Sequence, residues 1–194
     1  SMSTAIERIM RERGDLNCLH EPFLRYYYLE RSQKNLPMFN AGDDQPRSYE
    51  ATREMILEQA EHTPVFAKDM SYYIMPDLLK DVDFFAQIRH CFLIRNPLRS
   101  ILSYYNLDPY VLLKEIGIDS QWLHYQKAAQ WDLKPIVIEA ESVQSNPGVV
   151  MEQFWAELGL DYRHEALSWG LYSTPEDWKY VEGWHQQASQ SAGI

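Results

Sequence analysis

The fold is decided by one stretch of sequence, Phe92-Leu93-Ile94-Arg95-Asn96-Pro97-Leu98-Arg99-Ser100-Ile101-Leu102-Ser103-Tyr104-Tyr105. Its apolar start, His90 to Ile94, does not alternate, which predicts a strand buried on both faces of a parallel sheet. Pro97 suits the first turn of a helix because it has no N–H to lose there. The stretch therefore predicts a strand, a short turn and an amphipathic helix whose Ile101, Leu102 and Tyr105 face the core.

The turn between this strand and this helix is a candidate anion site. In open parallel sheets, ligands bind at the carboxyl ends of the strands, which is where Arg95 falls. A helix start offers free N–H groups to an anion, and a guanidinium grips a phosphate with a planar fork of donors. Ser103 lies further along the same helix, where its hydroxyl can reach the same phosphate. The alternative is that Arg95 only pairs with a surface carboxylate.

The rest of the chain predicts an α/β fold, with a parallel sheet flanked by helices. Thr4-Ala5-Ile6-Glu7 has the pattern of a capping box that opens a helix ending at Gly14. Residues 32–48 are rich in turn formers and predict a mobile loop, whereas residues 185–194 predict a frayed end. Without repeats or linkers, residues 1–194 predict a single domain. The other expected strands are Leu16 to Leu19, Pro64 to Ala67 and Lys134 to Glu139.

Composition narrows the class of protein. The 194 residues are 45% hydrophobic and 24% charged, which is typical of a soluble globular protein. A net charge of −10 argues against binding to a nucleic-acid polymer or an anionic membrane. Cys18 and Cys91 both fall in predicted buried strands and are expected to be structural thiols in a reducing compartment. We find no metal-ligand spacing, no membrane span and no signal peptide, and therefore expect a metal-free cytoplasmic protein.

The order of elements and the segment Arg95 to Tyr105 resemble the sulfotransferases that use 3′-phosphoadenosine 5′-phosphosulfate, in particular the bacterial and soluble branches. The resemblance extends over nearly the whole chain, including Asn146-Pro147 and the helix that follows it. It implies a P-loop-NTPase-like fold that moves a sulfonate from this nucleotide to a hydroxyl or amine of a small-molecule acceptor, as in EC 2.8.2, and releases 3′,5′-adenosine bisphosphate. It also implies that Arg95 and Ser103 hold the 3′-phosphate and that Ser191 belongs to a loop closing over it.

The start of the chain departs from the family pattern. Family members begin with a strand and a Gly-Ser/Thr loop that cradles the 5′-phosphosulfate. Here Ser3 and Thr4 resemble the end of that loop, but the strand and the basic residue of the loop do not precede them. We therefore expect an N-terminally truncated form of the fold, and a gap in the sheet that promotes homo-oligomers.

This departure leaves two functions open. The chain is either a sulfotransferase or a non-catalytic nucleotide-binding or interaction protein built on the same fold. A P-loop kinase is disfavoured because no GxxxxGK[ST] loop is found.

The general base has two candidates. In many family members a histidine follows a strand-terminal lysine, but Met70 occupies that position here, after Lys68-Asp69. Other members use a glutamate after the first helix and second strand, and Glu21 in His20-Glu21-Pro22-Phe23 matches that pattern. We expect desolvation to raise the pKa of Glu21 and make it the base, with His20 as second choice.

Each of these residues also has a purely structural alternative. Glu21 would then cap the helix starting near Phe23, and His20 would be a half-buried imidazole with its hydrogen bonds satisfied. Lys68 either neutralises charge on the bridging oxygen of the donor or pairs with Asp69 at the surface.

Overall fold

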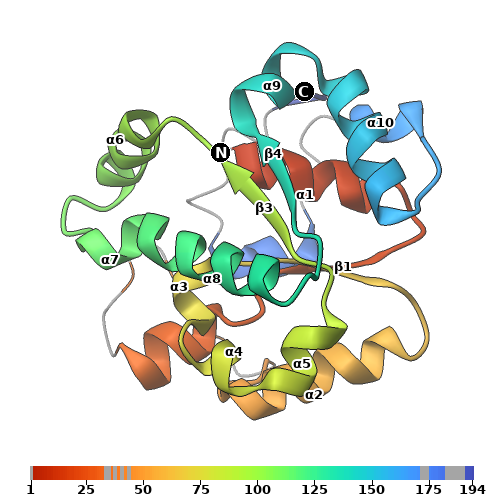
Figure 1. Ribbon diagram of the computed structural model, residues 1–194. Helices are drawn as coiled ribbons and strands as arrows, with labels where there is room; N and C mark the ends of the chain where they lie inside the picture. Colours follow the sequence, from red (N-terminus) through yellow and green to blue (C-terminus); the bar gives the residue numbers. More distant parts are fainter. Residues whose placement is uncertain are drawn as a thin grey trace. The chain divides into compact units, whose positions relative to one another are not determined.

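The structure is a computed structural model that describes residues 2–32, 36, 39, 42, 45–170, 175–181 and 191–194. The chain divides into two compact units (Figure 1). Unit 1 comprises Ser1–Asp69 and Arg163–Ile194, and unit 2 comprises Met70–Tyr162. Each unit is built on one pair of parallel strands flanked by helices.

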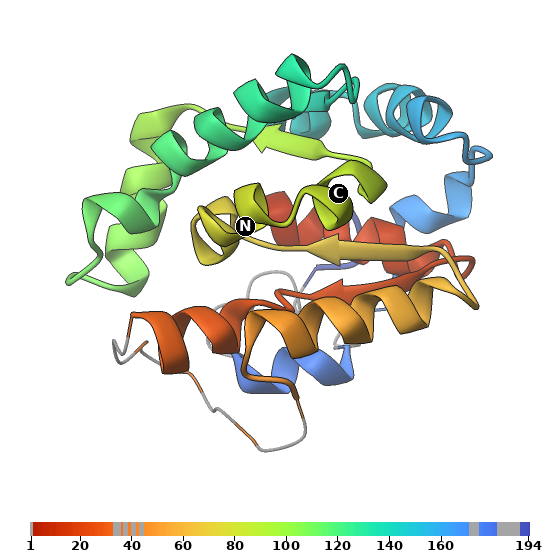
Figure 2. The ribbon, with the colours of Figure 1, turned by 60° about the horizontal axis from the view of Figure 1, so that its bottom comes forward.

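Unit 1 is centred on strands β1 and β2, which pair in parallel from Asn17 opposite Val65 to His20 opposite Lys68. Figure 2 shows α1 on one side of this pair and α2 on the other. The side chains of Ile9 and Met10 on α1 are fully buried and form the core of the unit. The elements of unit 1 are α1 (Met2–Glu12), β1 (Asn17–His20), the π-helical turn η1 (Tyr26–Arg31), α2 (Tyr49–Ala60), β2 (Val65–Lys68) and the 3-10 turns η2 (His164–Leu167) and η3 (Glu176–Tyr180).

Unit 2 is centred on strands β3 and β4, which pair in parallel from Cys91 opposite Ile136 to Ile94 opposite Glu139. Its core holds the buried rings of Phe85, Phe92 and Trp155. The elements of unit 2 are α3 (Ser71–Ile74), α4 (Asp77–Lys80), α5 (Val82–Gln87), β3 (Cys91–Ile94), α6 (Pro97–Leu107), α7 (Leu113–Ile116), α8 (Ile118–Gln130), β4 (Ile136–Glu139), α9 (Ala140–Ser145) and α10 (Pro147–Leu158).

The prediction of an α/β fold with parallel strands between helices is confirmed, and all four predicted strands are present. The described strands form two separate two-stranded sheets, however, where the sequence predicts one. The last strand begins at Ile136 rather than Lys134, because Lys134 has a φ of 48° that no strand residue adopts. The 32–48 loop lies partly outside the described residues, as does most of the segment from 185 onward.

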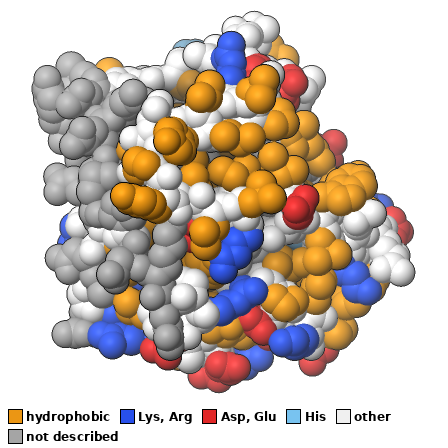
Figure 3. Space-filling view, turned by 90° about the vertical axis from the view of Figure 1, so that its left-hand side faces the viewer, with side chains coloured by type: hydrophobic (Ala, Val, Ile, Leu, Met, Phe, Trp, Pro, Cys, Tyr) orange, Lys and Arg blue, Asp and Glu red, His pale blue; other side chains and the backbone are white. Residues whose placement is uncertain are grey.

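The helix after Arg95 differs most from the prediction. Ile101, Leu102 and Tyr105 were expected to face the core, yet they are 39%, 62% and 54% exposed, and α6 has no buried residue. Figure 3 shows hydrophobic side chains gathered on the side of the molecule where α6 and α7 lie. Cys91 is likewise exposed although β3 is a strand as predicted, whereas Cys18 is buried, and both thiols are free. The expectation that β3 is buried on both faces is therefore wrong.

Unit 2 contains a pair of histidines, the buried His90 and the partly buried His124. His90 Nε2 lies 2.9 Å from the carbonyl oxygen of Phe85 and must donate to it, so His90 Nδ1 accepts from His124 Nε2 at 2.9 Å. Ser71 Oγ lies 3.5 Å from the remaining nitrogen of His124. Burial lowers the pKa of His90, and burial together with the neighbouring His90 lowers the pKa of His124 to about 3. Both rings are therefore neutral parts of the core at pH 7.

Candidate active site

The carboxyl ends of β1 and β2 bring three of the predicted site residues together. His20 pairs with Lys68 in the register of the two parallel strands, and Glu21 follows immediately. The Glu21 N–H donates to the carbonyl oxygen of Lys68 at 2.7 Å, which extends the strand pairing by one residue. Glu21 has a φ of 43°, in the left-handed region that side chains other than glycine rarely adopt. Such strain collects at functional sites because the surrounding fold must hold it in place.

Glu21 and Lys68 form a buried ion pair between Oε1 and Nζ. Their side chains are only 10% and 9% exposed. Burial works against the charge of Lys68, but the carboxylates of Glu21 and Glu7 outweigh it and raise the pKa of Lys68. Lys68 is therefore a fixed positive charge, and it favours the ionised form of Glu21. The alternative that Lys68 pairs with Asp69 at the surface is wrong.

A side chain other than that of Glu21 reaches the backbone at the start of the next helical segment. Asp69 takes that role, since its Oδ2 accepts a hydrogen bond from the Phe23 N–H at 3.0 Å. The Lys68 ammonium is the partner of the Glu21 carboxylate in their close ion pair. His20 Nε2 lies a further 3.9 Å from the same carboxylate oxygen.

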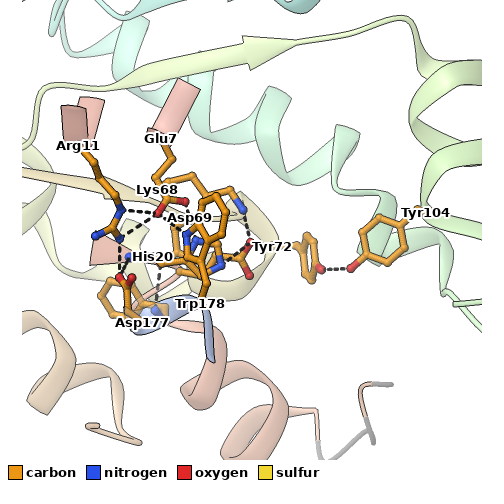
Figure 4. A network of polar contacts seen from close by, with 11 residues as sticks. Glu7, Arg11, His20, Lys68, Asp69, Tyr72, Tyr104, Asp177 and Trp178 are labelled. Atoms are coloured by element: carbon orange, nitrogen blue, oxygen red, sulfur yellow. Dashed lines mark hydrogen bonds and ion pairs between the residues drawn. The ribbon is translucent and has the colours of Figure 1, made fainter. Parts of the chain in front are cut away.

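Glu7 is the centre of a buried polar network (Figure 4). The side chain of Glu7 is fully buried on α1, where Oε2 lies 2.5 Å from His20 Nδ1 and Oε1 accepts hydrogen bonds from Arg11 Nε at 3.0 Å and Trp178 Nε1 at 2.9 Å. Burial alone would raise the pKa of Glu7, but its hydrogen bond to His20 and the charges of Lys68 and Arg11 hold that pKa below its ordinary value. His20 is therefore an oriented, buried imidazole, as its structural alternative predicts.

This network corrects the predicted start of the first helix. The helix begins at Met2, so Thr4 lies inside it with its side chain fully buried, and Glu7 binds His20 instead of closing a capping box. Ser3 lies beside Thr4 in the first turn and is partly exposed.

Asp177 joins the network from the far end of the sequence. It lies on η3, and its Oδ2 accepts hydrogen bonds from Arg11 Nη2 at 2.5 Å and from the His20 backbone N–H at 3.1 Å. Burial disfavours the charge of Arg11, but the carboxylates of Glu7 and Asp177 outweigh this effect and raise the pKa of Arg11. Unit 1 thus places three carboxylates and two cations, all mutually paired, around the ends of β1 and β2.

A pocket adjoins this network within unit 1. Its volume is about 470 Å³ with the part open to solvent included, and its polar lining comprises His20, Glu21, Arg25, Gln45 and Asp177. The strained Glu21 therefore borders this pocket.

Unit 2 carries the predicted phosphate residues. Arg95 directly follows β3, and Asn96 caps α6 with its Oδ1 accepting from the Leu98 N–H at 3.0 Å, which confirms the predicted strand, turn and helix. The side chains of Arg95 and Ser103 are partly exposed. Within the described residues neither side chain makes a hydrogen bond or an ion pair, so both are available to a ligand.

The helix that carries Ser103 is tied to the rest of unit 2 by a tyrosine pair. Tyr104 Oη lies 2.7 Å from Tyr72 Oη, and Tyr72 is buried on α3 (Figure 4). Tyr72 in turn lies beneath Gly117, since a Cβ at that position would be 3.1 Å from Tyr72 Cδ1. This pair fixes the part of α6 next to Ser103.

Sequence analysis missed Glu7, Arg11, Asp177 and Trp178. A signal for the first two was present, because residues four apart on a helix share a face and Glu7 and Arg11 have that spacing. Nothing local marks Asp177 or Trp178 as partners of a strand end more than 150 residues earlier in the chain. The remaining predicted residue, Ser191, lies partly exposed close to the bridge between Ser168 and Gly193.

Comparison with known families decides the assignment. A family model described as a sulfotransferase domain matches residues 1–194, the full length of this sequence. The chain belongs to this sulfotransferase domain family. No solved structure matches it significantly.

Two curated proteins of Arabidopsis thaliana are similar to this sulfotransferase domain. Branched-chain-amino-acid aminotransferase-like protein 2 is 23% identical over 198 residues, which cover 100% of this chain and 34% of the plant protein. Branched-chain-amino-acid aminotransferase-like protein 1 is 28% identical over 106 residues, which cover 55% of this chain and 19% of the plant protein. The chain thus spans about a third of the first relative's length.

No group of three or more His, Cys, Asp or Glu side chains in the described part of the chain has a geometry that could hold a metal ion. Among the helices of that same part, none combines the length and the apolar character needed to cross a bilayer.

Proposed function

We propose that this sulfotransferase domain transfers a sulfonate from 3′-phosphoadenosine 5′-phosphosulfate to a hydroxyl of a small acceptor, with Glu21 as the general base. The observation that carries the proposal is the buried Glu21–Lys68 pair, held on strained backbone at the ends of two parallel strands and beside a pocket. A base must lie within reach of the proton that it removes, and Glu21 borders the space an acceptor would fill.

The proposed step balances without a metal or a redox partner. The acceptor oxygen forms a bond to sulfur while the bond between sulfur and the bridging oxygen of the donor breaks. The hydroxyl proton passes to the Glu21 carboxylate, and 3′,5′-adenosine bisphosphate leaves. Lys68 supplies positive charge where negative charge builds up on the leaving oxygen, as in other group transfers dominated by positioning and electrostatics.

The residues assigned to the donor are those that the family resemblance implies. Arg95 and Ser103 would hold the 3′-phosphate, because a partly exposed guanidinium at a strand end and a hydroxyl on the following helix suit that group. Ser3 and Thr4 would lie toward the phosphosulfate and Ser191 toward the 3′-phosphate, as the family resemblance implies. The imidazole of His20 is oriented by its hydrogen bond with Glu7, and His20 remains the second candidate for the base.

The test of the base is transfer by Glu21→Gln, measured as release of 3′,5′-adenosine bisphosphate with a panel of phenols and alcohols. We expect turnover to fall by about 10²- to 10⁴-fold, as when a positioned base is removed. Glu12→Gln is the matched control, since Glu12 pairs with Arg8 away from the pocket and its variant should keep full turnover. Because Glu21→Gln leaves Lys68 buried without its partner, the double variant with Lys68→Met checks that loss of activity is not loss of folding.

Calorimetric titration with 3′,5′-adenosine bisphosphate tests the donor site separately. Arg95→Ala should weaken binding by about 10- to 100-fold, the usual effect of losing a charged hydrogen-bond partner. Arg99→Ala, on the exposed side of α6, should leave binding unchanged. Binding that depends on Arg95 without any turnover would instead favour a non-catalytic nucleotide-binding protein.

A further inference from the structure

The imidazole ring of His20 lies between two carboxylates of unit 1. Its Nδ1 is 2.5 Å from Glu7 Oε2 (Figure 4), and its Nε2 is 3.9 Å from Glu21 Oε1. The side chains of His20 and Glu7 are almost completely buried. Histidine is the side chain best suited to take up and release a proton near neutral pH, so this arrangement bears on where the proton of the proposed reaction goes.

The contact with Glu7 determines which nitrogen of His20 carries the proton. The pKa of Glu7 is held below its ordinary value, so its carboxylate is ionised at neutral pH and can only accept a hydrogen bond. Nδ1 of His20 must therefore donate to it, because two acceptors do not approach each other to 2.5 Å. The lone pair of the neutral ring is then on Nε2, the nitrogen on the side of Glu21.

Lys68 determines where a proton taken up by Glu21 is more stable. A proton that stayed on Glu21 would remove the negative charge from the close partner of a buried ammonium group, which is costly. On His20 the proton lies beside Glu7 instead, and the ion pair of Glu21 with Lys68 is restored. Closing the 3.9 Å gap to hydrogen-bond length takes a shift of about 1 Å, and catalytic hydrogen bonds commonly tighten by such amounts when substrate binds.

The charges around His20 favour a positive ring. Among the described residues, carboxylates outnumber cations on the elements that pack against β1, so a proton on His20 brings the group closer to neutrality. These charged neighbours are Glu7 and Arg11 on α1, Lys68 at the end of β2, Glu21 and Asp69 just beyond the two strands, and Asp177 on η3.

We propose that His20 is the second proton acceptor of this site, and that Glu7 is the positioning residue that sets its tautomer and balances its charge. The inference rests on the proposed function for the source of the proton. The acceptor hydroxyl gives its proton to Glu21, the proton passes from Glu21 to Nε2 of His20, and Glu21 returns to its ion pair with Lys68. The imidazolium gives the proton to water after the products leave.

Nitrogen NMR of protein labelled with isotopic histidine measures the tautomer, and the His20→Gln variant identifies the signals of His20. In the wild type the neutral ring should carry its proton on Nδ1. Glu7→Gln should move that proton to Nε2. Arg11 and Trp178 both donate to Oε1 of Glu7, so the amide oxygen takes this place and the amide nitrogen donates to Nδ1 of His20.

Asp177→Asn is the matched control for the tautomer. It removes a carboxylate from the same network, but Asp177 accepts from the backbone N–H of His20 and not from the ring. The proton should therefore stay on Nδ1 in this variant. A general effect of lost charge would move the proton in both variants alike and would overturn the role given to Glu7.

Transfer kinetics test the path of the proton. His20→Gln and Glu7→Gln should each lower kcat by about 10²- to 10⁴-fold, because the second acceptor is absent or carries its proton on the wrong nitrogen. Affinity for 3′,5′-adenosine bisphosphate, measured by calorimetry, should not change. If His20→Gln keeps the wild-type kcat, or if Glu21→Gln keeps activity that His20→Gln loses, the inference is overturned.

The tautomer separates this inference from the proposed function. A wild-type ring with its proton on Nε2 overturns the inference, and this measurement decides even if the variants do not fold. If the proton lies on Nδ1 and its position depends on Glu7, but the wild type transfers no sulfonate to any acceptor, the pairing of Glu7 with His20 stands and the proposed function fails.

Discussion

Glu7 shows how much one residue of the first helix determines. Its carboxylate receives hydrogen bonds from α1, β1 and η3, and so joins three segments that are distant in the sequence. A fully buried carboxylate is tolerated only with such compensation. The arrangement means that the imidazole of His20 and the ring of Trp178 are positioned by an electrostatic anchor as well as by packing.

We predict that Glu7→Gln destabilises unit 1 by about 3 kcal/mol, because Arg11 and His20 lose the charge that compensates their burial. The folded-state pKa of Glu7 lies below its ordinary value, so its contribution is present above that ordinary value and is lost as the pH falls through the folded-state pKa. Urea unfolding followed by hydrogen exchange in α1 measures both effects. The variant should show a smaller loss of stability on acidification than the wild type.

The control for this variant is Glu12→Gln. Glu12 pairs with Arg8 on the same helix but is 31% exposed, so its removal should change stability by less than about 1 kcal/mol. Equal destabilisation by the two substitutions would show that the buried network does not hold the unit together.

At the scale of elements, the turn between α7 and α8 in unit 2 is closely packed against a ring of α3. Gly117 ends α7 and precedes α8 with a φ of 79°, and it lies directly against the ring of Tyr72. That ring carries the hydrogen bond to Tyr104, and Ser103 is the neighbour of Tyr104 on α6. The turn at Gly117 therefore influences the helix that is proposed to hold a phosphate.

We predict that Gly117→Ala destabilises unit 2 by more than Gly159→Ala does. Both glycines have a positive φ, so both variants incur the roughly 1 kcal/mol cost of a left-handed residue with a side chain. Only at position 117 would the new methyl group also press on Tyr72, because nothing lies within 4 Å at Gly159. Thermal unfolding of the two variants measures the difference, and equal shifts would mean that Tyr72 moves aside freely.

Individual elements also show what sequence can and cannot predict. The four strands follow from short apolar runs, and the turn at Asn96-Pro97 follows from residues with strong local preferences, so these predictions succeed. The exposure of Ile101 and Leu102 could not be predicted, because periodicity shows that a helix has an apolar face and not what covers it. The meeting of His20 and Lys68 at the ends of β1 and β2 follows from the parallel pairing of two predicted strands, whereas the contribution of Asp177 depends on long-range folding alone.

At the scale of the molecule, the two units differ in how they respond to acid. Unit 1 is held by paired charges, whereas unit 2 contains the neutral His90–His124 pair. The pKa of each histidine is lowered on folding, so the unfolded chain binds protons more readily below pH 6.5, and the stability of unit 2 must fall as the pH decreases from there. The contacts of the pair are aromatic rings, Ser71 and a backbone carbonyl.

We predict that stability of unit 2 falls by up to about 1.4 kcal/mol per pH unit through His124 as the pH drops from about 6.5 towards its folded-state pKa of about 3, and that His90 adds a loss in the same direction. Replacing His124 by Gln, which keeps a donor to His90, should reduce this slope. His62→Gln, at an exposed position, should leave the slope unchanged. Hydrogen exchange of the β3 and α8 amides measures the slope, and an identical slope in His124→Gln would exclude the buried pair as its source.

The placement of η3 has a consequence for the order in which the molecule is completed. Residues 70–162 follow one another without interruption in unit 2, whereas unit 1 needs residues from both sides of them. During synthesis on the ribosome, Glu7, Arg11 and His20 emerge early but wait for Asp177 and Trp178 through more than 150 further residues. The partners that η3 supplies to Arg11 and His20 are therefore made only after the whole of unit 2.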